Sequence, residues 1–299
     1  MVSELGWCRS GEETLLSSAP DVVGVVGGGR MGAGIAQVFL VLGARVVVVE
    51  SDPSAGEAAV SRVREGLEGA RERGKLGSSP DEVLRGLDVV TAVEQLPAAD
   101  VVVEAVPEDP ALKVEVLTEA EAAVPAGTLL VTNTSSLSVA ELGAALQRPE
   151  SFAGMHFFNP VPASKLVEVV VAPSTAAGTR DAVREWARAL GKTDVVVRDS
   201  PGFATSRLGV ALGLEAIRML EEGVADAAAI DSAMELGYRH PMGPLRLTDL
   251  VGLDVRLAVA DYLREHLGER FAAPALLRSK VEAGEVGRKS GRGFHDWSG

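Results

Sequence analysis

The sequence predicts an α/β domain with a doubly wound, mostly parallel sheet, followed by an all-helical C-terminal domain. Two observations support this fold class. Short valine-rich runs alternate with longer segments of helical periodicity over roughly the first 200 of the 299 residues. Beyond residue 204 the valine-rich runs stop, and segments of helical periodicity that end at glycine follow one another.

Eight runs rich in β-branched residues predict strands that are buried on both faces. They lie at 21–26, 45–50, 87–93, 100–106, 128–133, 151–158, 165–171 and 194–199. Helices are expected between several of them, at about 32–43, 53–75, 110–124, 136–147 and 178–191. This alternation favours a parallel sheet with helices on both faces, as in Rossmann-type folds.

The change of pattern after "RDSPGF" places a domain boundary near Ser200. We therefore expect a flexible leader over 1–20, a nucleotide-binding domain over 21–200 and a helical domain over 201–299.

Composition excludes several function classes. The formal net charge of −13 gives no bulk attraction for nucleic-acid phosphates. No apolar run approaches the ~20 residues of a membrane span. The single cysteine, Cys8, rules out a disulfide within the chain and fits a cytoplasmic location. The four histidines do not fall at metal-ligand spacing, so we expect no metal.

The stretch "GVVGGGRMGAGIA" contains Gly27, Gly29 and Gly32 in the spacing G-x-G-x-x-G, between a predicted strand and a predicted helix. The first glycine allows a tight turn, the second lets a pyrophosphate approach the backbone, and the third lets the helix pack on the strand. Glu50 ends the next strand, where a carboxylate binds ribose hydroxyls and repels a 2′-phosphate. The pattern predicts NAD rather than NADP as cofactor, although glycines can also serve packing alone.

His156 and Glu168 are candidates for acid–base chemistry. His156 lies near a predicted strand end in "GMHFFNP", and Glu168 interrupts the apolar strand "KLVEVVV". A buried carboxylate is costly unless it is paired, and a facing imidazole would be made a stronger base. Two alternatives stay open: a hydrogen-bonded core histidine, and an ion pair of Glu168 with Lys165 or with another cation at the strand edge.

Seven motifs in order resemble the 3-hydroxyacyl-CoA dehydrogenase family, including its 3-hydroxybutyryl-CoA dehydrogenases, over residues 22–297. They are "GGGRMGAGIAQ", "VVEAVPED", "NTSSLSV", "GMHFFNPVPASKLVEVV", "DSPGFATSRL", "HPMGPLRLTDLVGLD" and "GRKSGRGF". The resemblance implies that the enzyme interconverts (3S)-3-hydroxyacyl-CoA and 3-oxoacyl-CoA with NAD. It implies that His156 is the general base or acid and that Glu168 orients it.

The same resemblance assigns further site residues. Ser135 would contact the substrate oxygen, and Asn159 would lie by the nicotinamide. Glu108 and Lys113 would line the cofactor site. The alternatives are that Glu108 is a solvated residue at a helix start and that Lys113 is an exposed helix cation. The helical domain would form a homodimer and close over the cleft.

One position departs from the family pattern. The family has asparagine before the arginine in the segment that reads "PGFATSRL" here, and this chain has Ser206. A serine still donates a hydrogen bond from a shorter side chain, or makes no ligand contact at all. Two alternative functions therefore stay open: a dehydrogenase of the same fold that acts on a carrier-protein-bound hydroxyacyl group or a sugar acid such as gulonate, and a non-catalytic dinucleotide-binding protein.

Overall fold

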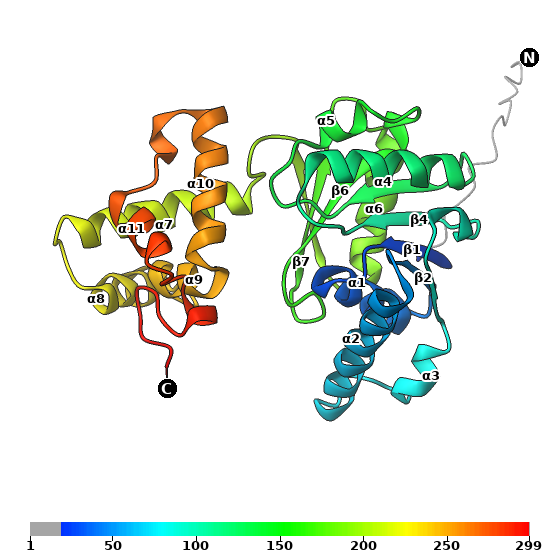
Figure 1. Cartoon of the computed structure of the whole chain (residues 1–299), viewed down its shortest axis with the longest axis horizontal. Coiled ribbons are helices and arrows are strands. Elements are labelled where there is room, and N and C mark those ends of the chain that lie inside the picture. Colours follow the sequence, from blue (N-terminus) through cyan, green and yellow to red (C-terminus); the bar gives the residue numbers. More distant parts are fainter. Residues whose placement is uncertain (1–18, 299) are drawn as a thin grey trace, which may run out of the picture.

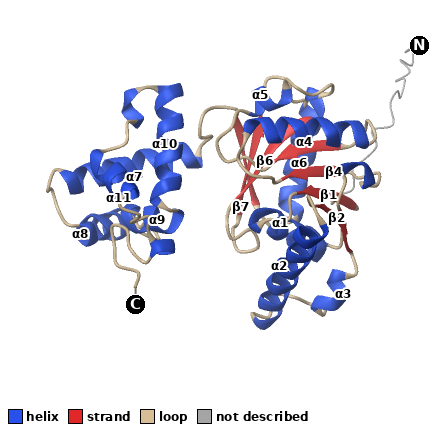
Figure 2. Cartoon of the chain, viewed as in Figure 1, coloured by secondary structure: helices blue, strands red, loops and turns tan. Residues whose placement is uncertain are grey.

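The structure is a computed structural model that describes residues 19–298 (Figure 1). Most of the predicted leader, with Cys8, lies outside the described residues. A sheet flanked by helices is followed by a separate group of helices, as Figure 2 shows by colour. The predicted order of an α/β part and an all-helical part is confirmed.

All eight predicted strands are present and form one sheet in the order β3-β2-β1-β4-β5-β6-β7-β8. Every neighbouring pair is parallel except β6 and β7, which are antiparallel. The strands are β1 (Val22–Val26), β2 (Arg45–Val49), β3 (Leu87–Val90), β4 (Val101–Glu104), β5 (Leu129–Thr132), β6 (Phe152–Phe157), β7 (Leu166–Val171) and β8 (Thr193–Arg198).

Helices cover both faces of the sheet, which explains the continuous apolar strands. One face packs against α1 (Arg30–Leu42), α2 (Pro53–Glu72) and α6 (Ala177–Ala189), and the other against α4 (Pro110–Ala123) and α5 (Val139–Gly143). The short helix α3 (Pro80–Leu84) was not predicted, because five residues are too few to show a helical period.

Helix α5 is much shorter than the predicted segment 136–147. Its first turn begins only after Ser138, whose hydroxyl caps the N–H of Glu141. The residues before Ser138 form a loop that makes hydrogen bonds to Glu108. Tertiary hydrogen bonds have therefore replaced local helical ones at this point of the chain.

The turn between β1 and α1 requires glycine at particular positions. Gly27 has a φ of +95°, which side chains rarely adopt. A Cβ added at Gly32 would lie 1.7 Å from the carbonyl oxygen of Gly27, so the helix could not pack as closely on the turn. A Cβ at Gly29 would meet nothing within 4 Å, so packing does not require glycine there.

The helical part has its own core, formed by apolar side chains such as Leu214, Leu245 and Leu263. Its elements are α7 (Thr205–Glu221), α8 (Ala227–Ser232), a π-helical turn over Ala233–Gly237, α9 (Pro244–Val251), α10 (Leu253–Leu267) and α11 (Ala275–Glu282). The structure contains no helix among residues 19–298 that is long and apolar enough to span a membrane.

Two buried carboxylates hold the last residues of this part in place. Asp231 accepts the N–H of Leu245 at the start of α9 and contacts Nε2 of His295 at 2.7 Å. Asp249 accepts the N–H of His295 and the indole N–H of Trp297. These contacts give the "HPMGPLRLTDLVGLD" segment a structural role.

The glycine turn yields a testable contrast in stability. We expect Gly32→Ala to lower the free energy of unfolding by about 1–3 kcal/mol, the usual cost of overpacking, because the new methyl group meets a backbone oxygen. Gly29→Ala is the matched control and should unfold like the wild type. Urea unfolding of the three proteins measures the difference, and equal midpoints would contradict this account of the turn.

Candidate active site

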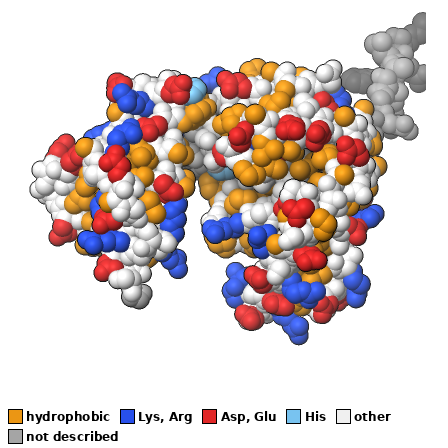
Figure 3. Space-filling view, in the orientation of Figure 1, with side chains coloured by type: hydrophobic (Ala, Val, Ile, Leu, Met, Phe, Trp, Pro, Cys, Tyr) orange, Lys and Arg blue, Asp and Glu red, His pale blue; other side chains and the backbone are white. Residues whose placement is uncertain are grey.

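A cavity of about 630 Å³ lies between the sheet and the helical part, where the space-filling view shows a cleft (Figure 3). Its sheet side is formed by the start of α1 and by the ends of β4, β5 and β6, and its other side by α7, α9 and α10. Predicted site residues that line it are Glu108, Lys113, Ser135, His156, Asn159 and Ser206. The carboxyl ends of parallel strands are where this fold class binds ligands.

His156 and Glu168 lie directly opposite each other on the antiparallel strands β6 and β7. Nδ1 of His156 is 2.8 Å from Oε2 of Glu168, and both side chains are buried. The imidazole ring lies between the rings of Phe158 and Phe203, at centroid distances of 4.4 and 5.7 Å. The two residues that the sequence suggested as a pair are thus in hydrogen-bond contact, and within residues 19–298 Glu168 forms no ion pair with Lys165.

Glu168 has partners beyond the imidazole. Its Oε1 accepts the N–H groups of Ala204 and Thr205 at 3.1 and 2.9 Å, and its Oε2 accepts the hydroxyl of Thr205 at 2.7 Å. Burial by itself raises the pKa of this carboxyl, but the hydrogen bonds from His156 and Thr205 outweigh burial and leave the pKa below its usual value of 4.5.

An ionised Glu168 determines the role of each imidazole nitrogen. Because the carboxylate can only accept, the neutral ring of His156 donates its proton from Nδ1. Nε2 has no hydrogen-bond partner within residues 19–298, and His156 lines the cavity. The arrangement leaves Nε2 free to accept a proton from a molecule bound there.

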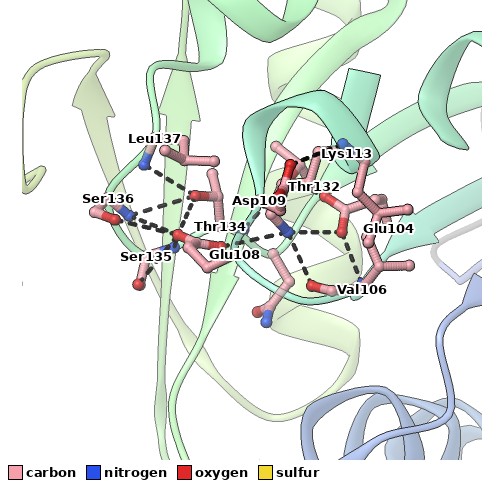
Figure 4. A network of polar contacts seen from close by, with 12 residues as sticks. Glu104, Val106, Glu108, Asp109, Lys113, Thr132, Thr134, Ser135, Ser136 and Leu137 are labelled. Carbon is pink, nitrogen blue, oxygen red and sulfur yellow. Dashed lines mark hydrogen bonds and ion pairs between the residues drawn. The ribbon is translucent and has the colours of Figure 1, made fainter. Parts of the chain in front are cut away.

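Glu108 organises the loop that follows β5, as Figure 4 shows. Its Oε1 accepts the hydroxyl of Thr134 at 2.6 Å and the N–H groups of Ser135 and Ser136 at 2.9 and 3.2 Å. Burial raises the pKa of Glu108, but Lys113, Thr134 and Ser135 together lower it below 4.5. Glu108 therefore fixes the position of Ser135 at the cavity wall.

Lys113 is fully buried and is neutralised mainly by Glu104, a residue that sequence reasoning missed. Nζ of Lys113 is 2.6 Å from Oε1 of Glu104 and 3.4 Å from Oε2 of Glu108. The parallel register places Glu104 beside Thr132, whose hydroxyl donates to Oε2 at 2.5 Å. Glu104 interrupts the valines of "VVVEAV" as Glu168 interrupts those of "LVEVVV", so the same signal was present for both.

Ser206 is the second residue of α7 and lies close to Ser135. Its hydroxyl donates to the carbonyl oxygen of Ser135 at 3.4 Å, across the junction of the two parts. Asn159 is exposed at the rim of the cavity. Asn133, which was also missed, accepts the N–H of Phe157 through its side-chain oxygen at 2.9 Å and joins the ends of β5 and β6.

The glycine turn fits a dinucleotide. Gly29 faces open space, and no side chain of the described residues caps the N–H groups of the first turn of α1, which also lacks an acidic residue. Arg30 and Met31 from this turn line the cavity. Glu50 is placed beside the turn, with its Oε1 accepting the N–H of Gly28 at 2.6 Å.

Two family models match the chain. The NAD binding domain of 3-hydroxyacyl-CoA dehydrogenase matches residues 22–200, and the C-terminal domain of the same enzyme matches residues 202–297. A probable 3-hydroxybutyryl-CoA dehydrogenase of Bacillus subtilis is 41% identical over 275 residues, which cover 91% of this chain and 96% of that protein.

Solved structures agree with the sequence matches. The crystal structure of Mycobacterium tuberculosis FadB2 has a TM-score of 0.89 and 41% identity, and the match covers 93% of this chain and 99% of that one. The (S)-3-hydroxybutyryl-CoA dehydrogenase PaaH1 of Ralstonia eutropha has a TM-score of 0.90 and 38% identity, with 94% and 100% covered. The chain therefore belongs to the 3-hydroxyacyl-CoA dehydrogenase family, and its first part is the NAD-binding domain of that family.

Proposed function

We propose that this enzyme interconverts (3S)-3-hydroxyacyl-CoA and 3-oxoacyl-CoA with NAD, and that His156 is its general base and acid. One observation carries the assignment, and it concerns the surroundings of the His156 ring. Nδ1 is hydrogen-bonded to the ionised carboxylate of Glu168, and Nε2 has no protein partner within the described chain. The ring lines the cavity together with the start of α1. Oxidation of an alcohol requires a base for the hydroxyl proton and a bound dinucleotide for the hydride, and this cavity has a residue or a turn suited to each.

In the oxidation direction, Nε2 of His156 takes the proton of the substrate 3-hydroxyl group. NAD supplies the acceptor for the hydride that leaves the same carbon. The ring becomes positively charged as it takes the proton, and the Glu168 carboxylate at 2.8 Å stabilises that charge. In the reverse direction His156 returns the proton to the 3-oxo oxygen.

The remaining site residues act by positioning. We assign Ser135 and Ser206 to hydrogen bonds with the substrate oxygens, and Asn159 to the nicotinamide side of the cavity. Glu108 and Lys113 line the cofactor side, and Glu108 acts largely through the Ser135 loop that it holds.

The cofactor site is formed by Gly27, Gly29, Gly32 and Glu50. Gly27 and Gly32 shape the turn, and Gly29 leaves room for the pyrophosphate of the dinucleotide at the start of α1. Oε1 of Glu50 accepts the N–H of Gly28, and we propose that Oε2 accepts a hydrogen bond from a hydroxyl of the adenosine ribose. Its negative charge favours NAD over NADP.

We also propose that residues 21–200 bind the cofactor and that residues 201–299 close over the substrate and form a homodimer. Support for the dimer comes from exposed apolar side chains of the helical part that do not line the cavity, because Leu236 and Tyr238 are 84% and 76% exposed. A cytoplasmic location agrees with the use of acyl-CoA and with a chain that has a single cysteine.

Replacement of the base tests the reaction. We expect wild type to oxidise NADH with acetoacetyl-CoA, and His156→Gln to lower kcat by about 10²–10⁴-fold, because the amide cannot transfer the proton. The Kd for NADH should change little, since His156 is assigned to the substrate. Stopped-flow turnover and fluorescence titration of NADH measure the two quantities.

The same assay separates the rival functions. Near-normal turnover in His156→Gln would contradict the role of this residue. Faster reduction of NAD by the wild type with gulonate, or faster oxidation of NADH with a 3-oxoacyl group on a carrier protein, would replace the acyl-CoA substrate. NADH binding without turnover on any of these compounds would indicate a non-catalytic dinucleotide-binding protein.

The pH dependence of stability tests Glu168. Because its folded-state pKa lies below 4.5, its hydrogen bonds contribute stability that is complete above that value and is lost as the pH falls through the folded-state pKa. We expect Glu168→Gln to cost about 1–3 kcal/mol of unfolding free energy at pH 7, and less as the pH falls below 4.5. Urea unfolding across this range checks it, and a pH-independent difference would contradict it.

Cofactor choice tests Glu50. Glu50→Gln keeps an oxygen for the N–H of Gly28 but removes the charge that repels a 2′-phosphate. We expect the ratio of kcat/KM for NADH over NADPH to fall at least about tenfold. Glu57→Gln, an exposed residue of α2, is the control. An unchanged ratio in Glu50→Gln would show that this carboxylate does not select the cofactor.

A further inference from the structure

The cavity contains a buried arginine with no partner in the described part of the chain. Arg256 of α10 lines the cavity and is only 7% exposed. Its Nε is buried without a hydrogen bond, and its guanidinium makes no ion pair with any described residue. One other buried side-chain atom among residues 19–298 lacks a partner, Oδ1 of Asp254, whose second oxygen is 2.6 Å from Lys289.

Other buried cations of the protein are satisfied. Lys113 is neutralised by Glu104 at 2.6 Å. Lys192 donates to the carbonyl oxygens of Val161 and Ser164, both at 2.7 Å. Burial without a partner lowers the pKa of Arg256 to about 10, so its guanidinium remains charged at neutral pH. A buried charge that nothing compensates is costly, and an anion from outside the chain would compensate it.

Helix α7 leaves space for this guanidinium. A Cβ added at Gly209 would lie 3.3 Å from a terminal nitrogen of Arg256, and one at Gly213 would lie 3.9 Å from its Nε. The head group therefore lies against two glycines one helical turn apart. Gly209 follows Ser206 by three residues, which is about 4.5 Å along the helix axis.

The helical side of the cavity is mostly apolar. Besides Arg256, the residues that α7, α9 and α10 contribute to the wall are Val210, Leu247, Val251, Val255 and Val259, with Gly209 and the hydroxyl residues Thr205 and Ser206. The one acidic residue on the described cavity wall is Glu108, which forms an ion pair with Lys113 and accepts hydrogen bonds from the Ser135 loop. The other arginine of the wall, Arg30, is exposed at the start of α1, beside the dinucleotide turn. A mostly apolar wall with one buried, unpaired cation suits a carbon chain with one terminal negative charge.

We infer that Arg256 binds a carboxylate at the far end of the acyl chain, so that the enzyme acts on thioesters of 3-hydroxy dicarboxylic acids. The inference rests on the proposed function, because it names the acyl group that the same cavity receives. A guanidinium presents paired N–H donors that match the two oxygens of a carboxylate. The singly charged carboxylate matches one arginine, whereas the multiply charged phosphates of CoA would leave most of their charge uncompensated against a mostly apolar wall.

Two thioesters that differ only at the chain end test the inference. 3-Oxoadipyl-CoA and 3-oxohexanoyl-CoA have the same six-carbon acyl chain, which ends in a carboxylate or a methyl group. We expect wild type to have the higher kcat/KM with 3-oxoadipyl-CoA, and Arg256→Met to lower the ratio of acid to methyl substrate by about 30-fold or more. The corresponding seven-carbon pair extends the measurement to a second chain length.

Arg264→Met is the matched control, because Arg264 lies on the same helix but pairs with Glu269 on the surface. It should leave the ratio of acid to methyl substrate unchanged. A wild-type preference for the methyl end at both chain lengths, or an equal ratio in wild type and Arg256→Met, would overturn the inference.

Binding without turnover separates this inference from the proposed reaction. If neither 3-oxoacyl-CoA is reduced, the proposed function fails, and calorimetric titration with adipyl-CoA and hexanoyl-CoA in the presence of NAD still tests Arg256. Adipyl-CoA should bind wild type more tightly than hexanoyl-CoA does, and Arg256→Met should lose this difference. Equal affinities in wild type would overturn the inference.

The free protein gives one more readout. Arg256→Met removes an uncompensated buried charge and keeps an unbranched chain, so its Tm should equal or exceed that of the wild type. A clear loss of Tm, or a loss of dimer mass in sedimentation, would show that Arg256 has a structural or subunit partner instead.

Discussion

The carboxylate of Glu168 is the group on which the rest of the site depends. It lies in the middle of a buried strand, where a charge is tolerated only if its oxygens are satisfied. Its hydrogen-bond partners are the imidazole of His156, the hydroxyl of Thr205, and the N–H groups of Ala204 and Thr205. The same group therefore orients the imidazole of His156 and anchors the start of α7, which couples the geometry of this ring to the placement of the helical part.

The buried charged side chains Glu104, Lys113 and Glu168 have hydrogen-bond or ion-pair partners, and Arg256 is an exception. Glu104 and Lys113 neutralise each other between strand and helix, and Glu168 is satisfied by donors from two parts of the chain. Arg256 has no such partner among the described residues. Folding alone does not explain an uncompensated buried charge, and the carboxylate that we propose as its ligand would compensate it.

Local sequence signals predicted part of the site, and the family resemblance supplied the rest, namely Glu108, Lys113, Ser135, Asn159 and Ser206. A carboxylate inside a valine run marks a buried charge, and this signal identified Glu168 and would have identified Glu104. Arg256 could not be found in this way, because α10 has arginines on both its buried and its exposed faces. Asn133 was missed because its hydrogen bond to Phe157 joins two strand ends that are far apart in the chain.

The eight strands, the glycine turn and the change from an α/β to a helical part could all be predicted from the amino-acid sequence, because burial periodicity and backbone conformation are local properties. The antiparallel pairing of β6 and β7, which places His156 opposite Glu168, became visible only in the folded structure. The folded structure also shows that the residues before Ser138 form a loop held by Glu108, and that Arg256 lines the cavity without a partner among residues 19–298. Strand direction, loop anchoring and side-chain pairing depend on contacts between distant segments, which periodicity along the chain does not encode.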